Sequence, residues 1–211
     1  VVVEKTGSEE FHRLFGAMDI MRDRLKQQYL DNEARQRRQH QIAQLNEALR
    51  GEKNVQMLGE HILRCMAEQM GTLVGAFYLY EHDELVLKAS HAFTIRKGGR
   101  NRFALGESLV GQSALEQKSF VVRDLPANYA IVASGLGESV PTEVMLAPLV
   151  LNGRLLGVLE LMSFRPFDNH DIEFLNRGSE GMAIALHSAM SRVQLAEALE
   201  QTRQQAEALE Q

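Results

Sequence analysis

The stretch that decides the fold is EVMLAPLVLNGRLLGVLELM, residues 143–162 of the 211-residue chain. Two apolar runs flank Asn152 and Gly153, and both residues tolerate the positive φ angles that a two-residue type I′ turn requires. The sequence therefore predicts an antiparallel hairpin with its turn at this dipeptide. Counting outward from the turn, Met145 faces Glu160 across the pair of strands.

Both faces of this predicted hairpin are largely apolar. With the pairing just given, one face carries Glu160 among apolar residues, and the other face is wholly apolar. A sheet with one solvated face would alternate apolar with polar residues, so both faces must be covered. We expect helices on the wholly apolar face and a lid or cavity on the face with Glu160. Because Pro148 cannot donate a ladder hydrogen bond, we expect an edge position or a β-bulge there.

Composition and charge argue against several classes of protein. The net charge of −5 does not suit a nucleic-acid-binding surface, which would need a basic face. No apolar run approaches the roughly 20 residues that span a bilayer. The single cysteine, Cys65, lies on the apolar side of a helical pattern, so we expect a buried thiol and no internal disulfide. The histidines do not cluster with cysteine or carboxylates at ligand spacing, and the sequence predicts no metal site and no cofactor.

The first half of the chain predicts a long helix, a second helix and a hairpin. The helical pattern covers residues 8–53, although its apolar stripe fails over 27–41. A second helix begins near Asn54 and ends at Gly71, which suits a left-handed C-cap. Residues 73–91 are rich in strand-forming side chains and predict a hairpin.

The second half predicts a short helix, further strands and a final helix. Ser108 is a candidate N-cap for the short helix. Asp168 or Asn169 can cap the final helix, with Asp171 in its first turn. Helices at the ends and hairpins between them indicate an α+β fold with an antiparallel sheet.

The connection over residues 92–103, AFTIRKGGRNRF, carries four basic side chains and no acid. One interpretation is a solvated surface loop. The other is a cationic lid, since arginine can form paired hydrogen bonds with a carboxylate or phosphate. Both interpretations stay open.

Several short motifs resemble those of the GAF domain, a small sensory module of many bacterial signalling proteins. The resemblance covers roughly residues 54–190. Its motifs are Gly106-Glu107-Ser108-Leu109-Val110-Gly111-Gln112, Asp124-Leu125-Pro126 with Tyr129, Ser134-Gly135-Leu136-Gly137-Glu138, Pro148-Leu149, and Gly157-Val158-Leu159-Glu160-Leu161 with Phe167. It implies an antiparallel sheet of five to six strands with helices on both faces, flanked by long N- and C-terminal coiled-coil helices.

The N-terminal segment resembles the second half of a HAMP domain, the relay that follows the last membrane helix in many bacterial receptors. That family has an acidic-acidic-x-Gly signature, which residues 4–7 match except that Lys5 replaces the second acid. The implied organisation is a partial HAMP domain over 1–26, a coiled-coil linker over 27–53, a GAF-like sensory domain over 54–190 and a C-terminal signalling helix over 191–211. Because the chain starts at Val1 and ends in a helical pattern, we expect a piece of a longer protein.

The order of these parts is similar to that of multidomain sensor histidine kinases. It implies a homodimeric, cytoplasmic relay module of an inner-membrane two-component receptor, linked to the membrane only through an upstream part of the parent. The module would bind a small ligand, which could be an anion. It would pass the resulting shift in packing or register through coiled coils to a histidine kinase region. A ligand-free dimerisation spacer, and the same module ahead of a cyclase or chemotaxis-type output domain, stay open as alternatives.

The sequence predicts no catalytic residue for this segment. It contains no nucleophile elbow, no Walker-type loop and no kinase ATP-site motif. Free-standing sulfoxide reductases of the GAF fold use pocket cysteines, and this chain lacks them. We therefore expect a binding module and not an enzyme.

The resemblance implies a pocket on the sheet face opposite the terminal helices, closed by the segments 92–103, 108–117 and 125–140. By position, the candidate ligand-binding residues are Phe93, Arg96, Leu109, Val110, Tyr129, Ser134, Met145 and Glu160. The candidate dimer-interface residues are Leu25, Ile42, Leu49, Leu186 and Leu199.

Overall fold

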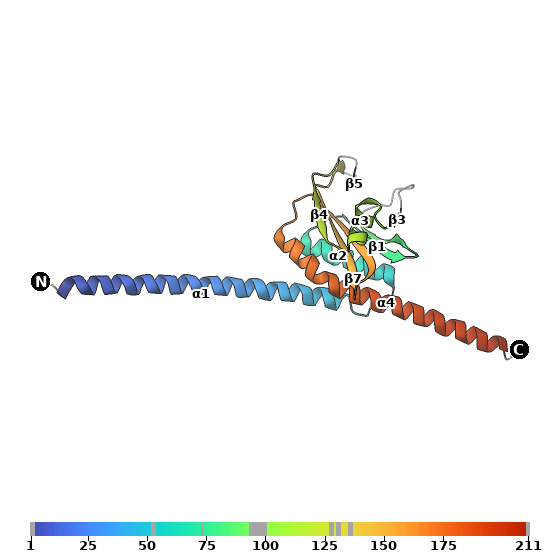
Figure 1. Cartoon of the computed structure of the whole chain (residues 1–211), viewed down its shortest axis with the longest axis horizontal. Helices are drawn as coiled ribbons and strands as arrows, with labels where there is room; N and C mark the ends of the chain where they lie inside the picture. The colour runs from blue at the N-terminus through green and yellow to red at the C-terminus, as the bar shows by residue number, and fades with distance from the viewer. Residues whose placement is uncertain are drawn as a thin grey trace. The chain divides into compact units, whose positions relative to one another are not determined.

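The computed structural model describes residues 3–51, 54–72, 74–92, 101–126, 129, 132–134 and 137–209 (Figure 1). By its contacts the chain divides into two units, Val1–Gln41 and Ile42–Gln211. The described residues of the first unit all belong to one helix, α1. Among the described helices, none is both long enough and apolar enough to cross a membrane.

The helices and the two hairpins follow one another in the predicted order, with long helices at both ends, and the structure adds the short strands β3, β5 and β6. Their bounds are α1 Val3–Ala48, α2 Val55–Met70, β1 Val74–Glu81, β2 Glu84–His91, β3 Arg102–Ala104, α3 Ser108–Glu116, β4 Phe120–Arg123, β5 Val132–Ser134, β6 Gly137–Ser139, β7 Glu143–Leu151, β8 Arg154–Ser163 and α4 Asn169–Leu209.

Six strands form one antiparallel sheet in the order β3-β2-β1-β8-β7-β4, and β5 pairs with β6 separately. Helices α2 and α4 cover one face of the six-stranded sheet, and the last turns of α1 join them there. Helix α3 lies on the opposite face, as Figure 1 shows. The predicted α+β architecture, with a sheet covered on both sides, is therefore confirmed.

Short-range signals place the ends of α2 as the sequence predicts. The side-chain oxygen of Asn54 accepts hydrogen bonds from the backbone N–H groups of Gln56, at 2.8 Å, and Met57, at 3.2 Å. At the other end, Gly71 has φ of 63° and donates its N–H to the carbonyl of Ala67. Both caps satisfy backbone groups that a helix end leaves without a partner.

Helix α3 begins differently from the prediction. Its N-cap is Glu107 and not Ser108, which is the first helical residue and has φ of 62°. The Glu107 carboxylate turns back and accepts the backbone N–H of Ala104 at 3.1 Å. The loop before α3 is tight, since a side chain at Gly111 would collide with the carbonyl of Ala104. The tight backbone of this loop therefore determines which residue caps α3, and the preference of serine for the N-cap position does not.

The turn of the β7–β8 hairpin lies where the sequence predicts it, with Asn152 and Gly153 at φ of 52° and 76°. Next to the turn, Val150 pairs with Leu155, but Leu149 pairs with Gly157. The residue between these two partners on β8 is therefore extra, which defines a β-bulge. The bulge lies beside Pro148, as expected for a proline in a sheet.

The bulge overturns the predicted pairing beyond it. Met145 pairs with Leu161 and not with Glu160, because every partner has moved by one residue. A shift of one residue exchanges the faces of a strand, since side chains alternate with period two. Met145 therefore lies in the core under α2 and α4, and Glu160 lies on the other face. The prediction that these two residues share a face was wrong.

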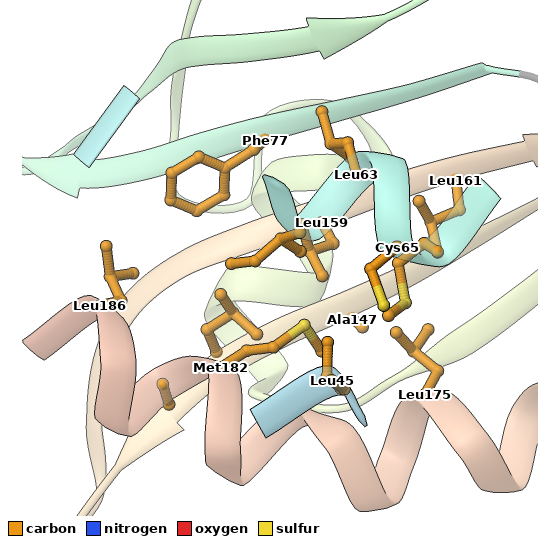
Figure 2. Close-up of a cluster of buried hydrophobic side chains, with 14 of the residues drawn as sticks. Leu45, Leu63, Cys65, Phe77, Ala147, Leu159, Leu161, Leu175, Met182 and Leu186 are labelled. Carbon is orange, nitrogen blue, oxygen red and sulfur yellow. The ribbon is translucent and has the colours of Figure 1, made fainter. Parts of the chain in front are cut away.

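The core on the helix side joins all three long helices to the sheet (Figure 2). Leu45 of α1, Leu63 of α2 and Leu175 of α4 are at most 1% exposed and belong to one cluster. Phe77 and Leu159 contribute to it from the sheet. Burial of this much apolar surface is the main source of the fold's stability.

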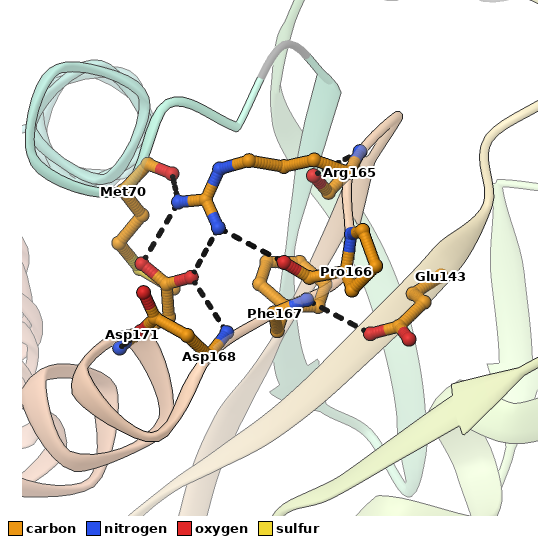
Figure 3. A network of polar contacts seen from close by, with 8 residues as sticks. Met70, Glu143, Arg165, Pro166, Phe167, Asp168 and Asp171 are labelled. Carbon is orange, nitrogen blue, oxygen red and sulfur yellow. Dashed lines mark hydrogen bonds and ion pairs between the residues drawn. The ribbon is translucent and has the colours of Figure 1, made fainter.

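A polar network holds the start of α4 (Figure 3). Asp168 accepts the backbone N–H of Asp171 at 2.8 Å, and Asp171 accepts that of Asp168 at 3.1 Å, which is a capping box. Arg165 donates two hydrogen bonds to the Asp171 carboxylate and one to the carbonyl of Met70, at the end of α2. Of the two predicted caps, Asp168 and Asn169, the structure has Asp168, and the network ties the start of α4 to α2.

Candidate functional site

A buried carboxylate marks the sheet face opposite the long helices. Glu160 lies in the middle of β8 and is only 6% exposed. Its neighbours Leu159 and Leu161 point to the opposite face and pack in the helix-side core. Strand alternation therefore places Glu160 on the α3 side of the sheet, among residues that are mostly apolar.

Two tyrosine hydroxyls hold the Glu160 carboxylate. Tyr78 of β1 donates to Oε2 at 3.2 Å, and Tyr129 of the β4–β5 connection donates to Oε1 at 2.8 Å. Tyr78 is 82 residues away in the chain, and the pairing of β1 with β8 brings it next to Glu160. Tyr129 is positioned by a turn in which its N–H donates to the carbonyl of Pro126 at 2.9 Å.

Burial and hydrogen bonding act in opposite directions on the pKa of Glu160, and in the same direction on the pKa values of the two tyrosines. Burial raises the pKa of the Glu160 carboxyl, and the hydrogen bonds from Tyr129 and Tyr78 lower that pKa by a smaller amount. The pKa values of both tyrosines are raised, first by burial and then by the adjacent carboxylate, so both hydroxyls stay protonated donors. An ionised carboxylate can accept about four hydrogen bonds, so the two oxygens keep acceptor capacity.

Apolar side chains surround this polar group. Val110 and Ala114 of α3 are at most 3% exposed and belong to the same cluster as Tyr78. The Tyr78 ring also meets Phe103 of β3 edge-on, with ring centroids 5.7 Å apart. A low-polarity environment strengthens each electrostatic contact that the carboxylate makes.

The structure brings together four of the eight predicted ligand-binding residues. Glu160 and Tyr129 are hydrogen-bonded, and Val110 and the partly buried Leu109 pack in the apolar cluster beside them. Met145 is excluded, because the bulge places it on the helix side.

Three other predicted ligand-binding residues cannot be placed in this group. Phe93 and Arg96 lie outside the described residues. Ser134 is in β5, but its side chain lies outside the described part of the chain.

Sequence reasoning missed Tyr78. It lies in GAFYLY, which is recognisable as a strand, but nothing local says that this strand pairs with the one carrying Glu160. The available signal was the alternation of β1, which puts Tyr78 and Tyr80 on one face. Only the pairing of β1 with β8 shows that Tyr78, and not Tyr80, lies next to Glu160.

The predicted interface residues fall into two groups. Leu25 and Leu199 are 59% and 64% exposed, and their side chains are open to a partner. Leu49 and Leu186 are at most 4% exposed in the core of their own chain, and Ile42 packs against that core. The heptad spacing at these three positions therefore reflects packing within the chain.

Cys65 is buried, as predicted, in the helix-side core. Burial also raises the pKa of its thiol, which reduces the thiolate fraction at neutral pH. Within the described ranges, no three His, Cys, Asp or Glu side chains come together in a way that could hold a metal ion.

Replacement of Glu160 by glutamine is expected to change how stability depends on pH. A raised pKa in the folded state favours folding below the unfolded value of 4.5, and this contribution is lost as pH rises through the folded pKa. Glutamine cannot ionise, so the stability of Glu160→Gln relative to the wild type should increase from pH 4.5 upward. Urea unfolding across the pH range measures this difference.

The matched control for this pH measurement is Glu116→Gln, an equal change of charge at an exposed position of α3. Because Glu116 is exposed, this variant measures the effect of removing one carboxylate that stays in water when the chain folds. Parallel curves for the two variants would contradict the burial effect at Glu160.

Comparison with known proteins supports the fold described above. A family model described as GAF domain matches residues 52–187, and no curated protein matches the chain. The GAF domain of a phosphoenolpyruvate-protein phosphotransferase from Coxiella burnetii is 18% identical with a TM-score of 0.61, over 74% of this chain and 95% of that chain. A putative GAF sensor protein from Burkholderia vietnamiensis is 20% identical with a TM-score of 0.58, over 72% and 94%.

A solved enzyme has a similar fold. The free methionine-R-sulfoxide reductase of Neisseria meningitidis, in complex with its substrate, is 22% identical with a TM-score of 0.59, over 73% of this chain and 90% of that chain. At this level of identity the likeness shows the fold alone.

Proposed function

This chain belongs to the GAF domain family, and on that premise we propose that it is a sensory relay module that binds a small molecule at Glu160. The observation that supports the proposal is the carboxylate itself. A carboxylate buried in an apolar layer costs free energy unless its interactions repay that cost. Such groups concentrate at binding and catalytic sites.

The chemistry of Glu160 indicates a ligand with hydrogen-bond donors or a positive charge. The two tyrosines leave acceptor capacity on the carboxylate, and a donor from a ligand can use it. An anionic group placed against Glu160 would be repelled. The expectation of an anion rests on the four basic side chains of residues 92–103. Arg96, Lys97 and Arg100 lie outside the described residues, and Arg102 pairs with Glu84 at 3.0 Å, so our proposal is a donor-bearing ligand.

We propose binding without catalysis for this segment. The chain's single cysteine, Cys65, lies in the core on the helix side, away from the face that carries Glu160. A cysteine-based reduction at the Glu160 face therefore has no thiol available in this chain.

The relay part of the proposal rests on α1. Between Phe15 and Tyr29, one side of α1 carries large side chains that are more than half exposed: Met18, Met21 and Leu25 at heptad spacing, with Phe15 and Tyr29 beside them. Exposed apolar stripes of this kind are buried when two helices form a coiled coil. We propose a parallel homodimer in the cytoplasmic part of an inner-membrane receptor that passes the change to a histidine kinase region.

The binding proposal is tested by mass spectrometry of bound small molecules and by thermal unfolding. Small molecules released from the purified wild-type protein are identified by mass spectrometry and added back to wild type, Glu160→Gln and Glu116→Gln. If the ligand binds at the carboxylate, it raises the melting temperatures of the wild type and Glu116→Gln in proportion to occupancy. The melting temperature of Glu160→Gln should rise much less. Equal shifts in all three proteins would contradict the site, and no released ligand with no response to a metabolite panel would favour the ligand-free spacer.

The dimer proposal is tested by light scattering with two matched variants of α1. Leu25→Glu puts a charge in the heptad stripe, and Ile20→Glu puts the same charge on an equally exposed apolar residue outside it. Leu25→Glu is expected to weaken the dimer strongly and Ile20→Glu is not. A monomeric wild-type protein at micromolar concentration would contradict the proposal.

A further inference from the structure

The negative charge of Glu160 has no counter-charge within the described part of the chain. The side chain is 6% exposed, and its described hydrogen-bond partners are the hydroxyls of Tyr78 and Tyr129. Both hydroxyls are neutral, and no described Lys, Arg or His side chain forms an ion pair with the carboxylate. Buried ions in proteins are ordinarily paired with an ion of opposite sign. The described site therefore carries an unbalanced charge whenever Glu160 is ionised.

Apart from the two tyrosines, the elements packed on this face bring no titratable group to Glu160. Their side chains next to the carboxylate or in the same cluster cannot ionise: Ala76 of β1, Leu146 of β7, Val110 and Ala114 of α3, and Phe103 of β3. Tyr80, two residues beyond Tyr78 on β1, turns its hydroxyl to Asp83 at 3.2 Å. The charge of Glu160 is therefore left for a ligand to balance.

Aromatic rings lie in the same layer as this carboxylate. Tyr78 and Tyr129 reach Glu160 through their hydroxyls, and Phe103 packs against the ring of Tyr78. The faces of such rings attract cations, most strongly where water is excluded. An anion would be repelled by Glu160, and within the described ranges no three side chains come together as ligands for a metal ion. These surroundings favour an organic cation.

We propose that Glu160 binds the positively charged group of an organic cation, such as a protonated amine on an apolar body. The inference rests on the proposed binding function and specifies the charge of the ligand. A neutral hydrogen-bond donor would leave the buried carboxylate unbalanced. An ammonium group donates to the remaining acceptor sites of the carboxylate and balances its charge as well.

Binding of a cation at this position is linked to the proton of Glu160. Burial raises the pKa of the carboxyl above its ordinary value of 4.5, and a cation requires the ionised form. Affinity for a cation should therefore rise with pH, by up to about tenfold per pH unit below the folded pKa, and level off above it. A neutral ligand does not require the ionised form, so its affinity should not rise in this way.

The test compares ammonium ions with alcohols of the same shape. The probes are methylammonium, butylammonium and benzylammonium chloride, with methanol, butanol and benzyl alcohol in sodium chloride of equal ionic strength. Simple amines with a pKa of about 10 stay charged up to pH 8. Thermal unfolding of the full chain is followed at pH 5 and pH 8, for the wild type, Glu160→Gln and Glu116→Gln.

At least one ammonium ion is expected to raise the melting temperature more than its alcohol does, and by more at pH 8 than at pH 5. Glu116→Gln should keep both differences, and Glu160→Gln, which has no negative charge to offer, should lose them. The comparison of the two pH values within the wild type needs no variant, so the inference stays testable if Glu160→Gln does not fold.

Three results would overturn the inference: alcohols as effective as the ammonium ions, differences that persist in Glu160→Gln, or no response to any of the three ammonium ions. The released-ligand experiment decides separately whether the site binds a molecule at all. A neutral compound that is released from the wild type and depends on Glu160 would support the proposed function and contradict the cation.

Discussion

Gly157→Ala is expected to destabilise the fold by about 3 kcal/mol, at the upper end of typical overpacking effects. An added β-carbon would lie 2.5 Å from the carbonyl oxygen of Tyr78 and 3.1 Å from the ring of Phe77. The first of these neighbours is backbone in the paired strand β1, and the second is fully buried, so neither can move aside cheaply. Urea denaturation of the wild type and the variant measures the loss.

The control for Gly157→Ala is the same substitution at Gly16 in α1, where a β-carbon meets nothing within 4 Å. Alanine is the better helix former, so Gly16→Ala should cost nothing and favour α1. A loss below about 0.5 kcal/mol for Gly157→Ala, the range of ordinary surface substitutions, would contradict the close approach at the bulge.

The second large effect is expected at the start of α4. Asp171→Ala removes the carboxylate that accepts two hydrogen bonds from Arg165 and one from the backbone N–H of Asp168. Asp171 is 3% exposed, whereas Arg165 is 46% exposed and can return to water. Loss of one half of the capping box and of the charge-assisted hydrogen bonds from Arg165 predicts a cost of about 3 kcal/mol in the free energy of unfolding. Circular dichroism during thermal and urea unfolding measures it.

The matched control for Asp171→Ala is Glu173→Ala, two residues further along α4. Glu173 pairs with Arg177 at 2.6 Å, but both side chains are more than a third exposed. Exposed ion pairs contribute roughly 0–1 kcal/mol, so this variant should lose little. Equal losses for the two variants would mean that the Arg165 network does not stabilise the start of α4.

Much of the fold could be predicted because its signals are local. The turn at Asn152 and Gly153, the cap at Asn54 and the left-handed end at Gly71 each depend on the preferences of one or two residues. Element order then follows from apolar periodicity, and the order led to the α+β class. Four of the eight predicted ligand-binding residues also lie together at the candidate site. Glu160 was predictable because a carboxylate inside an apolar strand is conspicuous whichever residue it pairs with.

The rest depended on contacts between distant segments. The extra residue of β8 reversed the face of Met145, and periodicity alone contains no sign of it. Tyr78 joined Glu160 only because β1 pairs with β8. An apolar stripe predicts that Leu49 and Leu186 are buried, but it does not identify the residues that bury them. In the structure both residues are buried by other parts of the same chain. Local backbone preferences are set by neighbours in sequence, whereas partners across a sheet or a core are set by which distant surfaces pack together.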